Sequence, residues 1–238
     1  MRLSEKPSWL RLGRLFARSV VALSLVPVVA FSAVPASAAP PRGAGSHGEA
    51  DNPIAHGVPR VPLTIDGESV SADEIVRYNG RALYLVALPE AGSPGRLAAF
   101  TEPADFERLV RARGGPRRAL DRSAVDARRA PQSQLEAGAA ASGYSYIYEG
   151  SQFAGHAGAL PAGSGYSDLT KRDMSCTLWW CTSWNDQASS AAADNANGVT
   201  LYEHIKFEGS QLFIPGGYAA LDLAYYGWDN RTSSWWSW

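Results

Sequence analysis

Apolar and polar residues alternate through residues 143–238. Tyr144, Tyr146 and Tyr148 fall on one face of an expected strand, and Gly-containing turns recur at intervals of about 8 to 12 residues. A period of two, interrupted by frequent turns, is typical of an antiparallel sandwich and not of helices. We therefore predict an all-β C-terminal domain over residues 143–238.

Two short phrases each occur twice in this domain. Residues 148–155 and 202–209 share an aromatic residue followed five positions later by Phe and then by x-Gly, at an offset of 54 (202 − 148). Residues 185–190 and 229–234 share two Asx residues, two free positions and Ser-Ser, each after a Trp. Because the two phrases recur in the same order, the domain is predicted to be a duplication.

Residues 61–113 show a shorter, mixed pattern that predicts a small α+β domain. An Asp-Gly pair after alternating residues is a hairpin signal, and Ser-x-x-Glu before Ile-Val has the spacing of a helix capping box. A Thr followed two positions later by Pro predicts the start of a second helix. The expected elements are a strand at 61–65 with the turn Asp66-Gly67, a helix from Ser71 to Tyr78, strands at 82–88 and 96–100, and a helix after Thr101 with Phe106, Leu109 and Val110 on its apolar face.

The N-terminus has the pattern of a secretory signal. Five basic residues lie in the first 18 positions, an apolar segment follows at 19–31, and Ala36-Ser37-Ala38 matches a small-x-small cleavage site. The apolar segment is too short to span a bilayer. We predict a signal peptide over residues 1–38 and a secreted, extracellular product with no membrane contact after cleavage. An uncleaved N-terminal anchor is the alternative.

Two further segments lack apolar periodicity. Residues 39–60 are rich in Pro, Gly and Ala and are predicted to be a disordered leader. Residues 114–142 combine Gly, Pro, Ala and many Arg and are predicted to be a linker. Its arginines would suit an anionic wall polymer, or a dibasic processing site at Arg117-Arg118, but the interspersed acids favour a solvated linker.

Charge and motif content argue against two classes of function. Without residues 1–38 the chain has 22 − 5 = 17 basic and 23 − 1 = 22 acidic residues, a net charge of −5. A nucleic-acid partner is therefore not expected. Nor is the chain predicted to be an enzyme, because His156 and His204, the histidines of the C-terminal domain, lie outside any metalloprotease or nucleophile-elbow motif.

Cys176 and Cys181 are the two cysteines of the chain, and an exported protein favours a local disulfide between them. Zinc is not expected, because two thiols without a nearby His cannot complete a site. Between its hairpin Gly and its turn Trp, the first unit spans 29 residues against 19 in the second. The disulfide is therefore predicted to staple an inserted loop, whose Trp179 and Trp180 are hard to bury and are candidates for a partner contact.

The two phrases together resemble the βγ-crystallin domain. In that family each unit is a four-stranded Greek key and two units pack into one sandwich, which implies units at 143–195 and 198–238 here. The resemblance also implies that the aromatic phrase forms a folded hairpin, in which Gly155 and Gly209 take a backbone conformation closed to other residues.

The resemblance implies calcium, and the chemistry of the turns agrees. Ca²⁺ takes roughly six to eight oxygen ligands, and affinity rises with their charge. One carboxylate in each turn therefore predicts two symmetric sites of modest affinity, suited to extracellular calcium. Asx-rich turns that merely cap strands, or a helix after Asp186, are the alternative. The expected ligands are the hydroxyls of Ser189 and Ser233, oxygens of Asn185, Asp186, Asp229 and Asn230, and main-chain carbonyls near Glu149 and Glu203, while Ser190 and Ser234 should turn inward and bond the hairpins.

These features predict a secreted, monomeric βγ-crystallin-type protein with a structural or binding role, stabilised by calcium. The chain also looks like exported actinobacterial proteins grouped with metallopeptidase inhibitors of crystallin fold. Inhibition of a secreted metalloprotease is therefore a second hypothesis. Binding of a cell-wall polymer or glycan through exposed tryptophans is a third.

Overall fold

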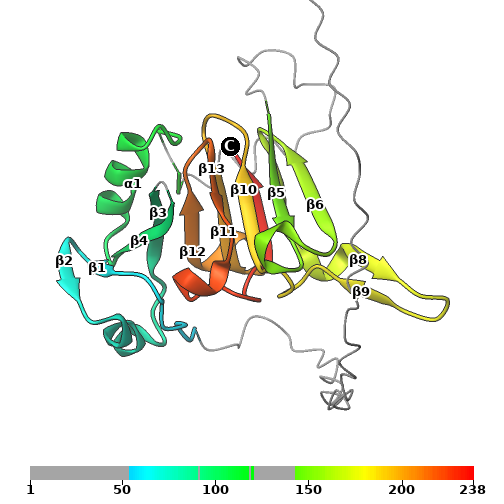
Figure 1. Ribbon diagram of the computed structural model, residues 1–238, viewed down its shortest axis with the longest axis horizontal. Coiled ribbons are helices and arrows are strands. Elements are labelled where there is room, and N and C mark those ends of the chain that lie inside the picture. Colours follow the sequence, from blue (N-terminus) through cyan, green and yellow to red (C-terminus); the bar gives the residue numbers. More distant parts are fainter. Residues whose placement is uncertain (1–53, 91, 118, 121–142) are drawn as a thin grey trace, which may run out of the picture. The chain divides into compact units, whose positions relative to one another are not determined.

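The computed structural model describes residues 54–90, 92–117, 119–120 and 143–238 (Figure 1). The predicted signal peptide and most of the predicted leader and linker lie outside the described residues. Among the described residues, no helix is long and apolar enough to cross a membrane.

Residues 143–238 fold as two four-stranded units that share two sheets (Figure 1). In each unit the last strand lies beside the first, as in a Greek key, while the third strand crosses into the sheet of the other unit. The all-β prediction for this region is confirmed. The first unit contains β5 (Tyr144–Tyr148), β6 (Ala157–Pro161), β7 (Ser164–Tyr166) and β10 (Ser190–Ala193), and the second contains β11 (Val199–His204), β12 (Glu208–Ile214), β13 (Tyr218–Ala220) and β14 (Ser234–Ser237).

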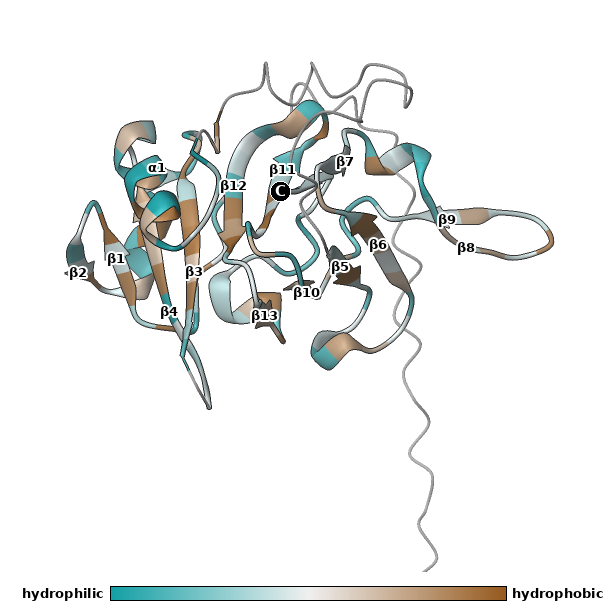
Figure 2. Ribbon diagram, turned by 90° about the horizontal axis from the view of Figure 1, so that it is seen from above, coloured by the Kyte–Doolittle hydropathy of each residue, from teal (hydrophilic) through white to brown (hydrophobic). Residues whose placement is uncertain are grey.

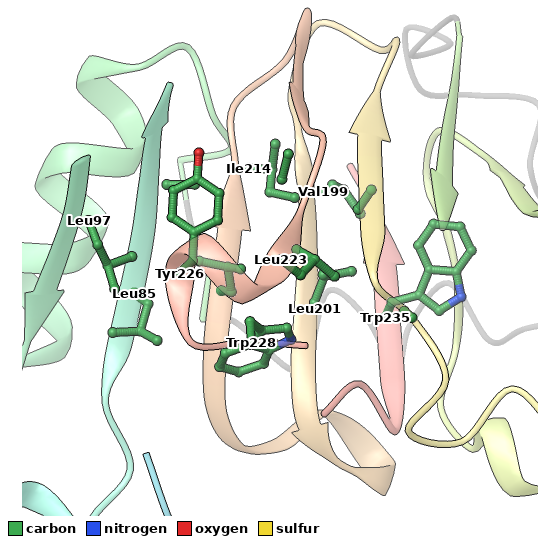
Figure 3. Close-up of a cluster of buried hydrophobic side chains, with 14 of the residues drawn as sticks. Leu85, Leu97, Val199, Leu201, Ile214, Leu223, Tyr226, Trp228 and Trp235 are labelled. Atoms are coloured by element: carbon green, nitrogen blue, oxygen red, sulfur yellow. The ribbon is translucent and has the colours of Figure 1, made fainter. Parts of the chain in front are cut away.

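The exchange of third strands couples the two units. β13 joins a four-stranded sheet of order β13-β10-β5-β6, and β7 pairs with β14 at the edge of the larger sheet. Buried side chains of both units form one cluster, which includes Ile147 of β5. Figure 3 shows three other members of this cluster: Leu201 of β11, Trp235 of β14, and Leu223 in the short 3₁₀ helix Leu223–Tyr226. Because each sheet contains a strand of the other unit, neither unit has a complete core alone.

Residues 61–113 extend the larger sheet. β3 runs parallel to β12, with Leu85 opposite Leu212, and the sheet has eight strands in the order β2-β1-β4-β3-β12-β11-β14-β7. The boundary that the sequence suggests near residue 113 therefore separates strands that share one sheet. The physical reason is that each of β3 and β12 would otherwise leave an unpaired edge. The elements are β1 (Leu63–Ile65), β2 (Glu68–Val70), the 3₁₀ helix η2 (Ala72–Tyr78), β3 (Tyr84–Glu90), β4 (Ser93–Phe100) and α1 (Pro103–Ala112).

The helix α1 lies over a second hydrophobic cluster of the larger sheet. Phe106 and Val110 are fully buried in this cluster, and Leu109 packs against it, as the predicted apolar face requires. The Phe106 ring lies 5.7 Å from that of Tyr84 on β3. Because the cluster also contains Phe213 of β12, α1 contributes to the same core as the second unit.

Two helix caps differ from the sequence prediction. Ser71 Oγ donates to the carboxylate of Asp73 and caps no backbone amide, and the helix that follows is 3₁₀. Thr101 precedes the N-cap of α1 and bonds the Asp66 carboxylate through both N and Oγ1, each at 2.8 Å. In both cases a nearby carboxylate competes successfully for the hydroxyl.

Residues 54–60, the end of the predicted disordered leader, lie against the folded chain. His56 N donates to Asn79 Oδ1 (2.8 Å), and Arg60 N donates to Tyr225 O (2.8 Å). This segment thus contacts both the loop between η2 and β3 and the second unit. Its composition gave no sign of these contacts, because they are made mainly by backbone groups.

Candidate metal centre

The two aromatic phrases form matching folded hairpins. Phe153 and Phe207 have φ values of 63° and 62°, and in each hairpin the preceding residue is also left-handed. Gly155 and Gly209, two positions later, have φ values of 78° and 75°. Few residues other than Gly adopt such angles without strain. The offset of 54 seen in the sequence therefore corresponds to the same backbone geometry in both units.

The last Ser of each turn fastens the turn to its hairpin. Ser190 Oγ donates to Gly150 O (2.7 Å) and accepts from the N–H of the hairpin phenylalanine (3.1 Å). Ser234 Oγ makes the equivalent bonds to His204 O (2.6 Å) and to its own hairpin phenylalanine (3.0 Å). Both serines are fully buried, in line with the sequence expectation.

The two Asx/Ser turns lie side by side. Asp186 N donates to Thr232 O, and Asn230 N donates to Ala188 O, both at 3.0 Å. Asp186 and Asn230, the second residues of their turns, both have a φ of 54°, which Asp and Asn tolerate better than most residues. A strand that begins at Ser190 follows the first turn, so Asp186 does not cap a helix.

The Asx side chains within each turn are bonded to one another. Asn185 Nδ2 donates to Asp186 Oδ2 (2.8 Å), and Asn230 Nδ2 donates to Asp229 Oδ2 (3.2 Å). The other oxygen of Asp186, Oδ1, accepts from Ser233 Oγ of the second turn (3.2 Å). A carboxylate of one turn and a hydroxyl of the other therefore meet, as shared ligation would require.

The fifth residues of the turns lie against the hairpins. Ser189 N donates to Tyr148 O (2.8 Å), and Ser233 N donates to Tyr202 O (2.9 Å). Each of these tyrosines directly precedes one of the two glutamates expected near the site. On each side, the structure thus holds the fifth residue of the turn next to the hairpin backbone that leads into the glutamate.

The side chains of Glu149 and Glu203 fold back along their own hairpins. Glu149 Oε2 accepts from His156 N (3.3 Å) and lies 2.8 Å from His156 Nδ1. Glu203 Oε2 accepts from Ser210 N (3.3 Å), the equivalent amide 54 positions later. The two carboxylates therefore make hydrogen bonds within their hairpins. The main-chain carbonyls of these residues are the atoms that could bind a cation.

The sequence analysis missed the contacts that Arg231 makes. Its Nη2 lies 2.5 Å from Glu203 Oε1, and the two side chains are only 16% and 11% exposed. The guanidinium also lies over the Trp228 ring, 5.6 Å from its centre. Gln187, at the same place in the first turn, instead bonds Asn185 O within its own turn (3.3 Å). Alignment of the two turns shows a basic residue at one of the two variable positions of the motif. It does not show that Glu203 is the partner of this residue.

The atoms gathered at the turns fit a hard cation. They are carboxylate, amide, hydroxyl and carbonyl oxygens, which are the ligands that Ca²⁺ prefers. Asn185 Oδ1 is buried and has no hydrogen-bond partner within the described residues. Since buried acceptors usually have a partner, this oxygen, next to Asp186 in the turn, is a candidate ligand for a cation. The described residues bring three His, Cys, Asp or Glu side chains together at Asp173, Cys176 and Cys181, but those sulfurs are joined in a disulfide.

Two titratable groups of the hairpins and the N-terminal segment have shifted pKa values. Hydrogen bonds from His156 lower the pKa of the exposed Glu149 carboxyl, so it is ionised at neutral pH. Burial lowers the pKa of His56, and the nearby Arg231 acts in the same direction. His56 Nε2 lies 2.9 Å from Arg81 O, which suits a neutral ring that donates to this carbonyl.

Cys176 and Cys181 form a disulfide in a hairpin outside the two main sheets. Its strands are β8 (Asp173–Cys176) and β9 (Cys181–Ser183), and it extends away from the sheets (Figure 2). Trp184 N donates to Arg172 O (2.8 Å) at its base, directly before the first Asx/Ser turn. The disulfide thus closes an inserted loop, as the comparison of the two units predicts.

The tip of this hairpin is apolar and exposed. Leu178, Trp179 and Trp180 are 94%, 86% and 68% exposed. Thr177 N donates to Trp180 O (2.8 Å), and Thr177 Oγ1 accepts from Trp180 N (3.3 Å), so the turn is hydrogen-bonded. The core contains the remaining tryptophans of the C-terminal region, Trp184, Trp228, Trp235, Trp236 and Trp238.

Comparison with known proteins gives distant structural likenesses. No family model and no curated protein matches this chain. A solved structure concerned with the evolution of the eye lens βγ-crystallin domain fold is 17% identical, with 41% of this chain and 87% of that chain covered and a TM-score of 0.33. A βγ-crystallin from Ciona intestinalis is 19% identical, with 40% and 100% covered and a TM-score of 0.31. A βγ-crystallin from an archaeon is 20% identical, with 41% and 99% covered and a TM-score of 0.30.

Proposed function

We propose that this chain is a secreted, calcium-binding protein of βγ-crystallin type, in which Ca²⁺ links the two Asx/Ser turns and stabilises the fold. The observation that carries the proposal is the contact between the turns, where Ser233 Oγ donates to Asp186 Oδ1. A cation bound there would contact both units at once. It would add to folding stability, because an ion that binds only the folded chain stabilises it by mass action.

The ligand set suits calcium better than a transition metal. The Asp186–Ser233 side would supply a carboxylate, a hydroxyl and the Glu203 carbonyl, and the Asn230–Ser189 side would supply an amide oxygen, a hydroxyl and the Glu149 carbonyl. These are hard oxygen donors, and water can complete the shell of Ca²⁺. Few of them are charged, so the affinity should match extracellular calcium concentrations.

Calorimetric titration of the mature chain with CaCl₂ tests this function. We expect binding heat and a rise in Tm, both abolished by the variant Asp186→Ala/Asn230→Ala. Titration with MgCl₂ is the control, because Mg²⁺ sheds its water reluctantly and suits small, rigid octahedral sites. Absence of both heat and a Tm shift with calcium would reject the proposal.

A second candidate function is partner binding by the disulfide hairpin, favoured by the exposure of Leu178, Trp179 and Trp180. Exposed apolar residues on an ordered turn lose little conformational entropy on binding, which suits a protease inhibitor or a wall-polymer binder. The ligand could be a secreted metalloprotease or a cell-wall glycan.

Two assays separate these ligands. If the hairpin is an inhibitor, the mature chain slows a thermolysin-type protease, and Trp179→Ala/Trp180→Ala removes the effect. If it binds wall polymer, the chain cosediments with purified cell walls and the same variant does not. Failure of both assays would leave the exposed tip without the proposed role.

A further inference from the structure

The two sides of the turn pair differ in charge at one equivalent position. Asp186 and Asn230 occupy the same place in their turns and have the same φ of 54°. The first presents a carboxylate oxygen to Ser233 of the opposite turn. The second is an amide, although its N–H bonds the opposite turn just as that of Asp186 does. Only the Asp186 side can therefore offer a carboxylate from this position. The carboxylate of the second turn, Asp229, lies one position earlier, where its Oδ2 accepts from Asn230 Nδ2.

The two sides also differ in how firmly the hairpin is joined to the turn. On the Asp186 side, the Arg231 guanidinium of the turn bonds the Glu203 carboxylate of the hairpin, and both are largely buried. On the other side, Glu149 pairs with the exposed His156 of its own hairpin. The side chain of Gln187, the residue equivalent to Arg231, bonds Asn185 O of its own turn.

We propose that the chain has two unequal calcium sites, and that Arg231 positions the stronger one. The stronger site contains Asp186, Ser233 and the Glu203 carbonyl; the weaker one contains Asn230, Ser189 and the Glu149 carbonyl. This inference rests on the proposed calcium function. Calcium fills the first site at low concentration and the second only at higher concentration.

Two effects favour tighter calcium binding at the site that contains Asp186. A carboxylate ligand adds a full negative charge, and calcium affinity rises with ligand charge. The Arg231–Glu203 pair holds the hairpin carbonyl and the Ser233 turn in a fixed relation, so less ordering is needed when the ion binds. The pair itself carries no net charge, so its main influence on the ion is geometric. Together we expect roughly a tenfold or larger difference in affinity, which corresponds to about 1.4 kcal/mol or more.

The contribution of the Asp186 carboxylate to calcium affinity is tested by exchanging the residue types at positions 186 and 230. Calorimetric titration of the mature wild-type chain should show two phases with CaCl₂. Asp186→Asn should weaken the tight phase by about tenfold and leave the weak one. Asn230→Asp should strengthen the weak phase until the two are nearly equal. Two equal wild-type phases, or an effect of Asp186→Asn on the weak phase alone, would overturn the inference while leaving the calcium function intact.

The role of Arg231 is tested by replacing it with Gln, the residue type at the equivalent position of the first turn, Gln187. Arg231→Gln should weaken the tight phase by about tenfold and spare the weak phase. Because this variant leaves Glu203 buried without a partner, Glu203→Gln/Arg231→Gln provides a second test with no orphan charge. His156→Gln is the matched control, since it removes the partner of the other hairpin glutamate and should not change the tight phase. Tighter binding by either Arg231 variant would show that Arg231 repels the ion and would refute its positioning role.

Failure of the two proposals can be told apart. A wild-type chain that gives no heat with calcium refutes the calcium function and this inference together. A chain that binds calcium with two equal phases refutes the inference alone.

Discussion

At Gly209 a left-handed backbone and close packing coincide. Its φ is 75°, and a Cβ placed there would lie 2.6 Å from Cδ2 of the His204 ring. Gly217 has nearly the same φ of 73°, but nothing lies within 4 Å of its Cβ position. A comparison of Gly209 with Gly217 therefore distinguishes the effect of backbone strain from that of steric conflict within one unit.

We therefore expect Gly209→Ala to destabilise the fold more than Gly217→Ala. Left-handed strain alone should cost about 1–2 kcal/mol in each variant, and displacement of the His204 ring adds to it only at Gly209. Chemical denaturation of both variants measures the difference in the free energy of unfolding. Equal losses would contradict the steric part of this argument.

His56 makes stability depend on pH. Burial lowers its pKa in the folded chain below the ordinary 6.5, so the unfolded chain binds more protons once the pH falls below about 6.5. The free energy of unfolding therefore decreases on acidification from that pH down to the lowered pKa. His56→Gln cannot titrate, and its Tm should vary less between pH 7 and 5 than that of the wild type. An unchanged slope would rule out this contribution.

At the residue scale, local patterns were informative and long-range partners were not. The hairpin glycines and the inward serines follow from the repeated spacing of the two phrases. The ion pair of Arg231 with Glu203 does not, because a free position in a turn gives no information on what lies opposite in the fold. Ser71 shows the same limit: its spacing to Glu74 suits a cap, but the nearer Asp73 accepts its hydroxyl.

At the element scale, the disulfide hairpin is an addition to the sandwich and not part of its framework. Among the strands that the structure describes, β8 and β9 pair only with each other. We expect Cys176→Ser/Cys181→Ser to preserve the fold and the proposed calcium binding, with a loss of at most about 2 kcal/mol in the free energy of unfolding because the closed loop is short. Circular dichroism and hydrogen exchange check this, and faster exchange should be confined to the tip residues 177–180. Global unfolding of the variant would contradict an accessory role.

The sequence predicted most elements but not which edges they share. Alternation and the Asp66-Gly67 turn indicated the hairpin of β1 and β2, and unequal spacing identified the inserted loop. The parallel pairing of β3 with β12 could not be inferred, since a strand pattern does not state its neighbour. For the same reason residues 61–113 were expected to form a separate domain.

At the scale of the whole molecule, a buried polar network joins the two sheets. Asn195 Nδ2 donates to Ser145 Oγ of β5 (2.6 Å) and Ser237 Oγ of β14 (3.1 Å), while its Oδ1 accepts from Gly198 N (2.6 Å) and Asn197 N (2.9 Å). Asn195 itself is fully buried. The segment between β10 and β11 therefore connects the two sheets through buried hydrogen bonds.

Asn195→Ala should lower the free energy of unfolding by about 2–4 kcal/mol, because it leaves several buried donors and acceptors without partners. The affinity of the proposed calcium sites should be unchanged, since the hydrogen bonds of the Asn195 side chain go to Ser145, Ser237, Asn197 and Gly198 and to neither turn. Asn197→Ala is the control and should have little effect, because only the backbone of Asn197 enters the network. Thermal unfolding with and without CaCl₂ measures both quantities.

The junction of β3 with β12 has a consequence for the order in which the protein matures. Leu85 and Leu212, which face each other there, are 127 positions apart (212 − 85). Contacts between such distant parts of a chain slow folding. During synthesis, the apolar edge of β3 that pairs with β12 stays open until β12 has been made. We expect nascent chains to be vulnerable to aggregation and proteolysis in that interval, so that a folding chaperone added to an in vitro synthesis should raise the yield of folded protein.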